Sequence, residues 1–292
     1  MKIVLASTEY GGILTAGQVD FYNAQGYLVL DRLLTDAELE PARTAMSQKV
    51  DMIADELVRH GKVTDPLKHR PFRNRLAELF SGLTDQDFLQ YGRSWRDRIP
   101  GYFILMGTPK ILDVVQSLIG PEIFANPVYN VRPKVPKVAA GAVPWHQDKS
   151  YWPGANANPV ITVWIPLVDA TKENGCLHLI PGTHQQRVIE HFNEGQTGTG
   201  YLSLSDDVAK GKKIVQLPVP AGSAILFNDR LLHMSTPNQS DHVRWSVDLR
   251  YQPTNQDPMP QHGIGFLARS RRFPERVATL ADWLENKSAH GT

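Results

Sequence analysis

The chain contains a single cysteine, Cys176, among its 292 residues. No internal disulfide can form, so a buried core must hold the fold together without cross-links. No apolar run approaches the roughly 20 residues that a helix needs to cross a bilayer, and the short run at residues 3–6 falls below the length of a signal-peptide core. These absences favour a reducing, cytoplasmic location.

The sequence also lacks an excess of charge of either sign. Its 31 Lys and Arg residues nearly balance its 30 Asp and Glu residues. No electrostatic attraction therefore favours a nucleic acid or an anionic membrane as partner, and a small-molecule substrate is expected. The sequence does not indicate an oligomeric state.

What the sequence does have is material for one large domain, since 41% of its residues are hydrophobic. Thr15 with Gln18 and Thr35 with Glu38 have the form of capping boxes. They predict a short helix that Gly26 ends and a longer helix from 35 to about 60. A strand at 27–30 is expected between the two helices. Residues 61–100 should form helices and loops that pack on the core. A strand is favoured at 102–106 and a helix at 109–119.

The character of the sequence changes near residue 123. Short segments rich in Val, Ile, Leu and aromatic residues alternate with turn residues, which is typical of a sandwich or jelly roll. Asn174-Gly175 predicts a hairpin turn. We expect a single domain over 1–292, mainly β with a helical elaboration. It comprises a helical part over about 15–120, a jelly-roll core over about 123–251 and a helix over about 272–286. Within the core the expected strands are 160–168, 177–180, 214–219, 223–228 and 243–251.

A possible metal site begins at His146 and Asp148. Residues two apart in a strand share one side, so both side chains can reach one metal while Gln147 faces away. With His233, which follows the strand-like run 222–227, they form a donor set suited to one face of iron(II). Each histidine alone is more often a core or surface residue, so the context of the motif decides.

Residues 242–251 alternate, with polar side chains at even positions and apolar ones at odd positions. A strand of a solvated sheet would show the same pattern. If the strand lines a polar pocket, Arg244 points inward near His233, where its planar fork matches a carboxylate. Arg250 has the same parity but lies about 20 Å further along an extended strand, so we do not expect it to share that task. Arg132 and Lys134 either line the pocket or face water.

Several motifs in this order resemble a known family. They are Trp145-His146-Gln147-Asp148, residues 173–184 with the sequence ENGCLHLIPGTH, and His233-x-Ser235-x-x-Asn238-x-Ser240-x-x-x-Arg244. Together they resemble the phytanoyl-CoA dioxygenase family of Fe(II)/2-oxoglutarate oxygenases, and the likeness spans most of residues 15–251.

The resemblance implies a double-stranded β-helix, a cupin-like jelly roll, that holds iron through His146, Asp148 and His233. It implies 2-oxoglutarate and O2 as cosubstrates, with the distal carboxylate of 2-oxoglutarate on Arg244. The remaining cosubstrate residues that it implies are Ser235, which assists Arg244, and Trp164, for which plain core packing is the alternative.

The function expected from the resemblance is oxidation, most simply hydroxylation, of a C–H bond in a small organic molecule of secondary metabolism, with release of succinate and CO2. Tyr102, Tyr151 and Trp152 are candidates for an aromatic wall around the substrate, although core packing would explain them equally. Two alternatives stay open. The same three ligands would serve a zinc hydrolase, and a jelly roll without activity would use the pocket only for binding.

Overall fold

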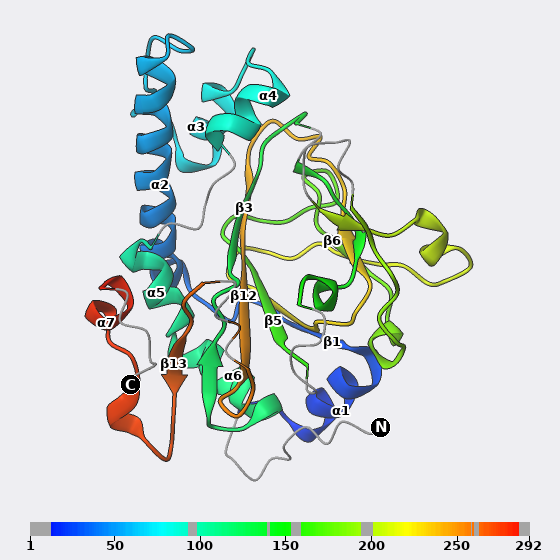
Figure 1. Ribbon diagram of the computed structural model, residues 1–292. Helices are drawn as coiled ribbons and strands as arrows, with labels where there is room; N and C mark the ends of the chain where they lie inside the picture. Colours follow the sequence, from blue (N-terminus) through cyan, green and yellow to red (C-terminus); the bar gives the residue numbers. More distant parts are fainter. Residues whose placement is uncertain are drawn as a thin grey trace.

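The computed structural model describes residues 13–92, 98–138, 141–152, 159–193, 201–257, 259 and 263–285. Its strands form antiparallel sheets of seven, four and two strands, and helices flank them (Figure 1). The helices are α1 (Ala16–Gln25), α2 (Asp36–Arg59), α3 (Phe72–Leu79), α4 (Asp85–Asp87), α5 (Pro100–Met106), α6 (Pro109–Ile119) and α7 (Leu280–Leu284). The strands are β1 (Tyr27–Leu30), β2 (Ile123–Ala125), β3 (Asn130–Lys134), β4 (Val143–His146), β5 (Ile161–Pro166), β6 (Leu177–Leu179), β7 (Phe192–Asn193), β8 (Leu202–Ser203), β9 (Val215–Leu217), β10 (Ala224–Asn228), β11 (His233–Ser235), β12 (Arg244–Pro253) and β13 (Phe266–Arg269).

The first two helices form as predicted. Both predicted capping boxes are present, with Thr15 and Thr35 each accepting a hydrogen bond from the backbone three residues on. Gly26 ends α1 in the left-handed region at φ 81°, where a side chain would be strained. These local signals suffice because they act within one turn of the helix.

The prediction of a strand at 102–106 is wrong. These residues lie in the helix α5. Pro100 stands at its first turn, which is compatible with a helix start, and α5 packs closely against α2, where a side chain at Gly101 would collide with the backbone of Pro41. A short apolar run does not distinguish a buried helix from a strand, and here contact with α2 decides.

The region 61–100 contains α3, α4 and a π-helical turn, Phe88–Gly92, in agreement with the prediction of helices and loops. Phe72 stacks on Trp245 of β12 with ring centroids 4.9 Å apart, so this region packs on the core as expected. Trp95, one of the aromatic residues there, lies outside the described residues. The predicted C-terminal helix at 272–286 is shorter than expected. The chain first makes a 3-10 turn, Pro274–Arg276, and α7 covers only five residues.

The seven-stranded sheet has helices on one face and the smaller sheet on the other (Figure 1). Its order is β1-β10-β5-β12-β2-β13, with β3 also paired to β12. The odd-numbered residues of β12, such as Trp245 and Leu249, belong to the core cluster shared with the helices. The even-numbered ones are buried as well, so the alternative of a solvated sheet is wrong and these polar side chains face the interior.

The four-stranded sheet has the order β4-β11-β6-β9. Apolar residues of both sheets, among them Trp164, Phe227 and Leu179, form a second core cluster. The predicted turn at Asn174-Gly175 exists, with Gly175 at φ 82°, but it connects β5 in the large sheet to β6 in the small one. It is therefore a crossing between sheets and not a hairpin.

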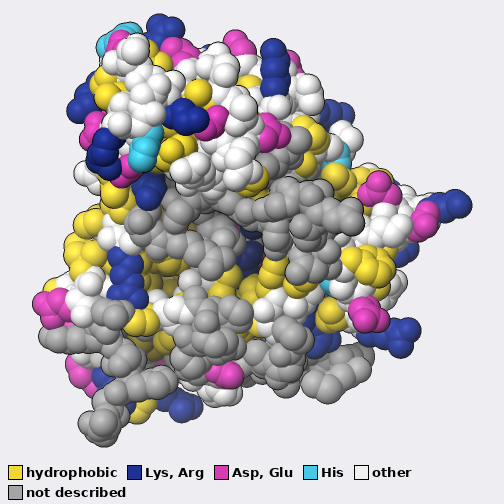
Figure 2. All heavy atoms as spheres, turned by 45° about the horizontal axis from the view of Figure 1, so that its top comes forward, with side chains coloured by type: hydrophobic (Ala, Val, Ile, Leu, Met, Phe, Trp, Pro, Cys, Tyr) yellow, Lys and Arg dark blue, Asp and Glu magenta, His cyan; other side chains and the backbone are white. Residues whose placement is uncertain are grey.

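In the described part of the chain, no single helix is long and apolar enough to span a bilayer, and only α5 with α6, bent by 45° at their junction, would pass by length and composition. On the face of the molecule seen in Figure 2, acidic and basic side chains are interspersed over the end formed by α2, α3 and α4. This matches the near balance of charges in the sequence.

Candidate active site

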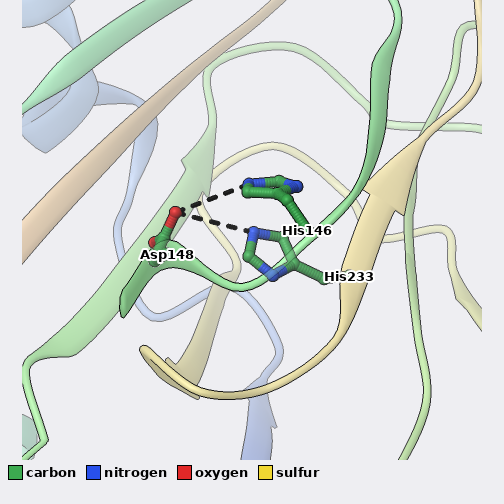
Figure 3. A group of neighbouring side chains, drawn as sticks. All are labelled: His146, Asp148 and His233. Carbon is green, nitrogen blue, oxygen red and sulfur yellow. Dashed lines mark ion pairs between the residues drawn. The ribbon is translucent and has the colours of Figure 1, made fainter. Parts of the chain in front are cut away.

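His146 and His233 lie directly opposite each other on neighbouring strands. His146 ends β4 and His233 begins β11, and the two are paired in register, so their side chains emerge on the same face of the small sheet. Their ring centroids are 4.0 Å apart, and both rings point toward Asp148 (Figure 3).

Both imidazoles have the tautomer that a metal ligand needs. The Nδ1 of His146 lies 2.9 Å from the carbonyl of Pro144, and the Nδ1 of His233 lies 2.9 Å from the carbonyl of Leu231. A carbonyl only accepts, so Nδ1 carries the proton and Nε2 keeps its lone pair. Burial and the neighbouring imidazole lower the pKa of His233 to about 3, which keeps that ring neutral.

The Asp148 side chain lies beside the two histidine rings although strand β4 ends before Asp148. β4 ends at His146, and Asp148 begins a 3-10 turn, Asp148–Tyr151. Gln147 between them is still extended, with φ −120° and ψ 126°, so the side chains on either side of it share one direction. Gln147 itself faces away, as predicted, and donates to the carbonyl of Arg230.

The two oxygens of the Asp148 carboxylate have different surroundings. Oδ1 lies 3.5 Å from Nε2 of His146 and 3.9 Å from Nε2 of His233. Oδ2 accepts from the Arg250 guanidinium over 2.9 Å and from the Thr162 hydroxyl over 2.9 Å. Burial alone would raise the pKa of Asp148, but the Arg250 guanidinium outweighs it and holds the pKa well below its usual range. The carboxylate is thus ionised, and Oδ1 faces the histidines.

These three donors fit iron(II). One ligand atom from each of His146, Asp148 and His233 can be chosen so that all lie within 4.8 Å of one another, and all three residues are buried. Two neutral imidazoles and one carboxylate on a single face leave the opposite coordination positions for other ligands. Zinc accepts the same donors, so the donor set alone does not select the metal.

A pocket of about 350 Å³ adjoins the triad. Its lining includes Arg244, Ser235 and Trp164. It also includes Arg132 and Asp248, which form an ion pair of 2.8 Å. The pocket is therefore polar and lies between the two sheets, where the metal ligands also face.

Arg244 is 1% exposed and has no carboxylate partner among the described residues. Nη1 of Arg244 donates to Ser246 Oγ over 2.6 Å, and the guanidinium lies 5.3 Å from the ring centre of Trp164. Its Nε has no hydrogen-bond partner among the described residues. Burial lowers its pKa to about 10, which still leaves the group charged at neutral pH. A buried, unpaired cation beside a pocket is suited to an anionic ligand.

The segment after His233 forms a turn that Asn238 organises. Its amide donates to the backbone carbonyls of Lys134 and His242, both over 2.7 Å, and its Oδ1 accepts from Ser240. The turn thus ties β11 to β3 and to the start of β12.

The three aromatic residues suggested for a substrate wall lie in different places. Tyr102 is 2% exposed within α5, where its ring meets Tyr129 at 6.0 Å. Trp152 is also 2% exposed, and its indole donates to Asp229. Neither lines the pocket. Tyr151 is nearest to the metal ligands, with its ring 6.2 Å from that of His146.

Sequence reasoning missed the positions of Arg250 and Thr162. Arg250 was set apart from Arg244 by distance along the strand, but the strand runs the whole length of the site, and its far end reaches Asp148. The parity that Arg250 shares with Arg244 was the available signal. Nothing in the sequence marked Thr162, since a threonine in an apolar strand is common.

Comparison with known proteins assigns the family. The family model described as phytanoyl-CoA dioxygenase matches residues 22–246. The chain belongs to the phytanoyl-CoA dioxygenase family. It is therefore an oxidoreductase, a dioxygenase that uses iron(II), 2-oxoglutarate and O2. This confirms the predicted family and enzyme class, and the zinc hydrolase and the inactive binding protein are no longer favoured.

The relatives cover most of this chain at low identity. The bovine peroxisomal phytanoyl-CoA dioxygenase is 23% identical over 255 residues, covering 85% of this chain and 71% of its own length. The phytanoyl-CoA dioxygenase domain-containing protein 1 of Danio rerio is 26% identical over 292 residues, covering 85% of this chain and 98% of its own.

Solved structures show the fold. The α-ketoglutarate-dependent carbocyclase SnoK from nogalamycin biosynthesis is similar with a TM-score of 0.57 at 22% identity, covering 89% of this chain and 91% of its own. EctD from S. alaskensis, solved with 2-oxoglutarate and 5-hydroxyectoine, has a TM-score of 0.53 at 20% identity, with coverages of 86% and 80%. The predicted cupin-like jelly-roll core is confirmed.

Proposed function

We propose that His146 Nε2, Asp148 Oδ1 and His233 Nε2 are the iron ligands of this dioxygenase. The observation that supports this most directly is the convergence of three buried donors from β4, the turn after it and β11, each held by a hydrogen bond on its far side. Such outer hydrogen bonds orient the ligands and set their basicity.

The same pocket suits 2-oxoglutarate. We assign its distal carboxylate to Arg244, whose fork has unused donors, with the hydroxyl of Ser235 assisting. Trp164 lies under the Arg244 guanidinium and limits how that side chain can move. The keto acid end of 2-oxoglutarate then lies toward the metal ligands, because Arg244 and these ligands line the same pocket.

The contribution of the protein to the reaction is position and exclusion of water. When bound, iron and 2-oxoglutarate supply the activation of O2 that oxidises a C–H bond and yields succinate and CO2. Arg250 and Thr162 donate hydrogen bonds to the Asp148 carboxylate, backbone carbonyls orient the two histidines, and the buried walls keep water from the reacting centre. A substrate approaches beside the metal and does not need to bind it.

The substrate is proposed to be a small organic molecule, and hydroxylation the simplest outcome, since Asp148 occupies the position where halogenating members of the wider class have a small residue. The Arg132–Asp248 pair lines the part of the pocket left for it. The single-domain organisation, the place in secondary metabolism and the cytoplasmic location stay predictions.

Anaerobic loading followed by metal analysis and a succinate assay tests the proposal. Iron(II)-dependent release of succinate from 2-oxoglutarate is expected, with one metal site per chain. Zinc-dependent hydrolysis, or binding of 2-oxoglutarate without turnover, would contradict it.

The variant Asp148→Ala tests the ligand set. It should lose iron binding and succinate release while near-UV circular dichroism shows the native packing, because Arg250 keeps the Val128 carbonyl and the Asp248 carboxylate, 3.9 Å away, as partners. Ordinary turnover in this variant would remove Asp148 from the ligand set.

A further inference from the structure

Lys134 is a buried lysine that the proposed function leaves without a role. It ends β3, is 2% exposed, and lies opposite Arg244 in the register of β3 and β12. Its Nζ donates to Ser235 Oγ over 2.7 Å and to the carbonyl of Thr236. The side chain runs past Gly175, where a Cβ atom would come within 2.9 Å of it.

No carboxylate within the described residues forms an ion pair with Lys134. A lysine charge buried without an anion is unfavourable by several kcal/mol. Burial, then Arg244 and Arg132, lower its pKa well below the usual value. The titratable and charged groups that face it are Arg132 on β3, Arg244 on β12, His178 on β6, and Cys176 just before β6.

Lys134 determines which way the Ser235 hydroxyl points. A hydroxyl has one proton, and its lone pairs accept. Because Ser235 Oγ accepts from Lys134, its own proton is free to be donated into the pocket that it lines. This is the direction required to bind a carboxylate held by Arg244.

A diacid bound there would change the surroundings of Lys134. Its distal carboxylate would place a negative charge next to Ser235, one hydrogen bond away from Nζ. An added anion favours the protonated form of a lysine. The arginine beside it stays charged throughout, so the lysine is the group that responds.

We propose that Lys134 is a positioning residue for the cosubstrate carboxylate, which it serves through Ser235, and that the bound diacid favours its protonated form. Binding of 2-oxoglutarate is then coupled to uptake of a proton. This inference rests on the proposed role of Arg244 and Ser235, and it adds a residue and a pH dependence to that site.

Calorimetry tests the proposal through the proton itself. 2-Oxoglutarate is titrated into anaerobic protein loaded with Mn(II), in pairs of buffers of different ionisation enthalpy, from pH 6 to pH 9. The wild-type chain should take up as much as about one proton per diacid, and its Kd should rise with pH. Lys134→Met should bind about tenfold more weakly at pH 7, as expected for loss of a charge-assisted contact, with no proton uptake and a flat pH profile.

Lys172→Met is the matched control, because Lys172 is an exposed lysine in the neighbouring loop, and it should behave as wild type. If Lys134→Met does not fold, Lys134→Arg replaces it and should bind without proton uptake. Equal proton uptake in the wild-type chain and the Lys134 variant overturns the proposal. The variant Arg244→Ala distinguishes failure of the proposed cosubstrate site from failure of the proposed role of Lys134. Unchanged affinity in that variant overturns the proposed cosubstrate site, whereas weakened binding there with normal proton uptake in Lys134→Met overturns only the role of Lys134.

Discussion

The two inward-facing arginines of β12 have opposite surroundings. Arg250, at one end, donates twice to Asp148 and also to the carbonyl of Val128. Arg244, at the other end, contacts only the Ser246 hydroxyl and the ring of Trp164 among the groups that the structure describes. Both are buried to 4% exposure or less, so burial does not distinguish them. The two arginines differ in that Arg250 has a carboxylate as its partner.

The difference separates a residue that completes the protein from one that awaits a ligand. The charge of Arg250 is neutralised within the fold, and removing it leaves a buried carboxylate unpaired. The charge of Arg244 has no such partner, so its removal affects a ligand more than the fold. Comparing variants of the two arginines measures this distinction.

Arg250→Ala is expected to have the largest effect. Breaking a buried ion pair by removing one partner destabilises a protein by about 3–5 kcal/mol. Chemical denaturation of the metal-free protein should show this loss, and iron affinity should fall about 10- to 100-fold because Asp148 Oδ1 is no longer held toward the histidines.

Arg269→Ala serves as the control for Arg250→Ala. Arg269 forms a 2.7 Å ion pair with Asp113, but its side chain is 23% exposed and that of Asp113 39%, so the loss should be at most about 1 kcal/mol. Equal losses of unfolding free energy in the two variants would show that the buried Arg250–Asp148 pair stabilises the protein no more than an exposed pair does.

Asp229 extends the comparison to a buried carboxylate that forms no ion pair with an arginine among the described residues. Its Oδ2 accepts from Trp152, its Oδ1 has no hydrogen-bond partner in the described part of the chain, and burial raises its pKa to about 6. Since the folded protein then holds a proton that the unfolded chain releases near pH 4, this group lowers the free energy of unfolding as the pH rises from about 4 through about 6.

Asp229→Asn should remove that part of the pH dependence. At about 1.4 kcal/mol per pKa unit, the difference in unfolding free energy between the variant and the wild-type chain should shift in favour of the variant by up to about 3 kcal/mol from pH 4 to pH 8. Urea denaturation at several pH values measures it. Parallel pH profiles would mean that Asp229 is already ionised at low pH in the fold.

Arg244→Ala should act on the cosubstrate. The Kd of 2-oxoglutarate should rise by one to two orders of magnitude, as loss of a charge-assisted pair predicts, while the metal-free protein loses much less stability than Arg250→Ala does. Pyruvate, a keto acid without a distal carboxylate, is the control ligand, and its weak binding should be the same in both proteins. An unchanged Kd for 2-oxoglutarate would move the anchor elsewhere.

Much of this site was visible in the sequence because it is local. His146 and Asp148 are two residues apart in extended chain, and the alternation in 242–251 placed Arg244 on the polar side of its strand, although it left open whether that side faces a pocket or water. The capping boxes at Thr15 and Thr35 likewise act within one turn. What the sequence could not provide depended on contacts between distant segments. α5 is a helix because it packs on α2, and Arg250 reaches Asp148 because the site extends along the strand.

Thr162→Val is the smallest change and tests how finely Asp148 is held. Thr162 Oγ1 donates to the same oxygen as Arg250, and valine keeps the shape of the side chain. Because Arg250 still satisfies Oδ2, the loss should be that of one hydrogen bond, about 1 kcal/mol, seen as a severalfold weaker iron affinity with little change in the Kd of 2-oxoglutarate. If Thr162→Val weakened iron as much as Arg250→Ala, the threonine and not the arginine would orient the carboxylate, and the distinction between the two ends of β12 would need a different explanation.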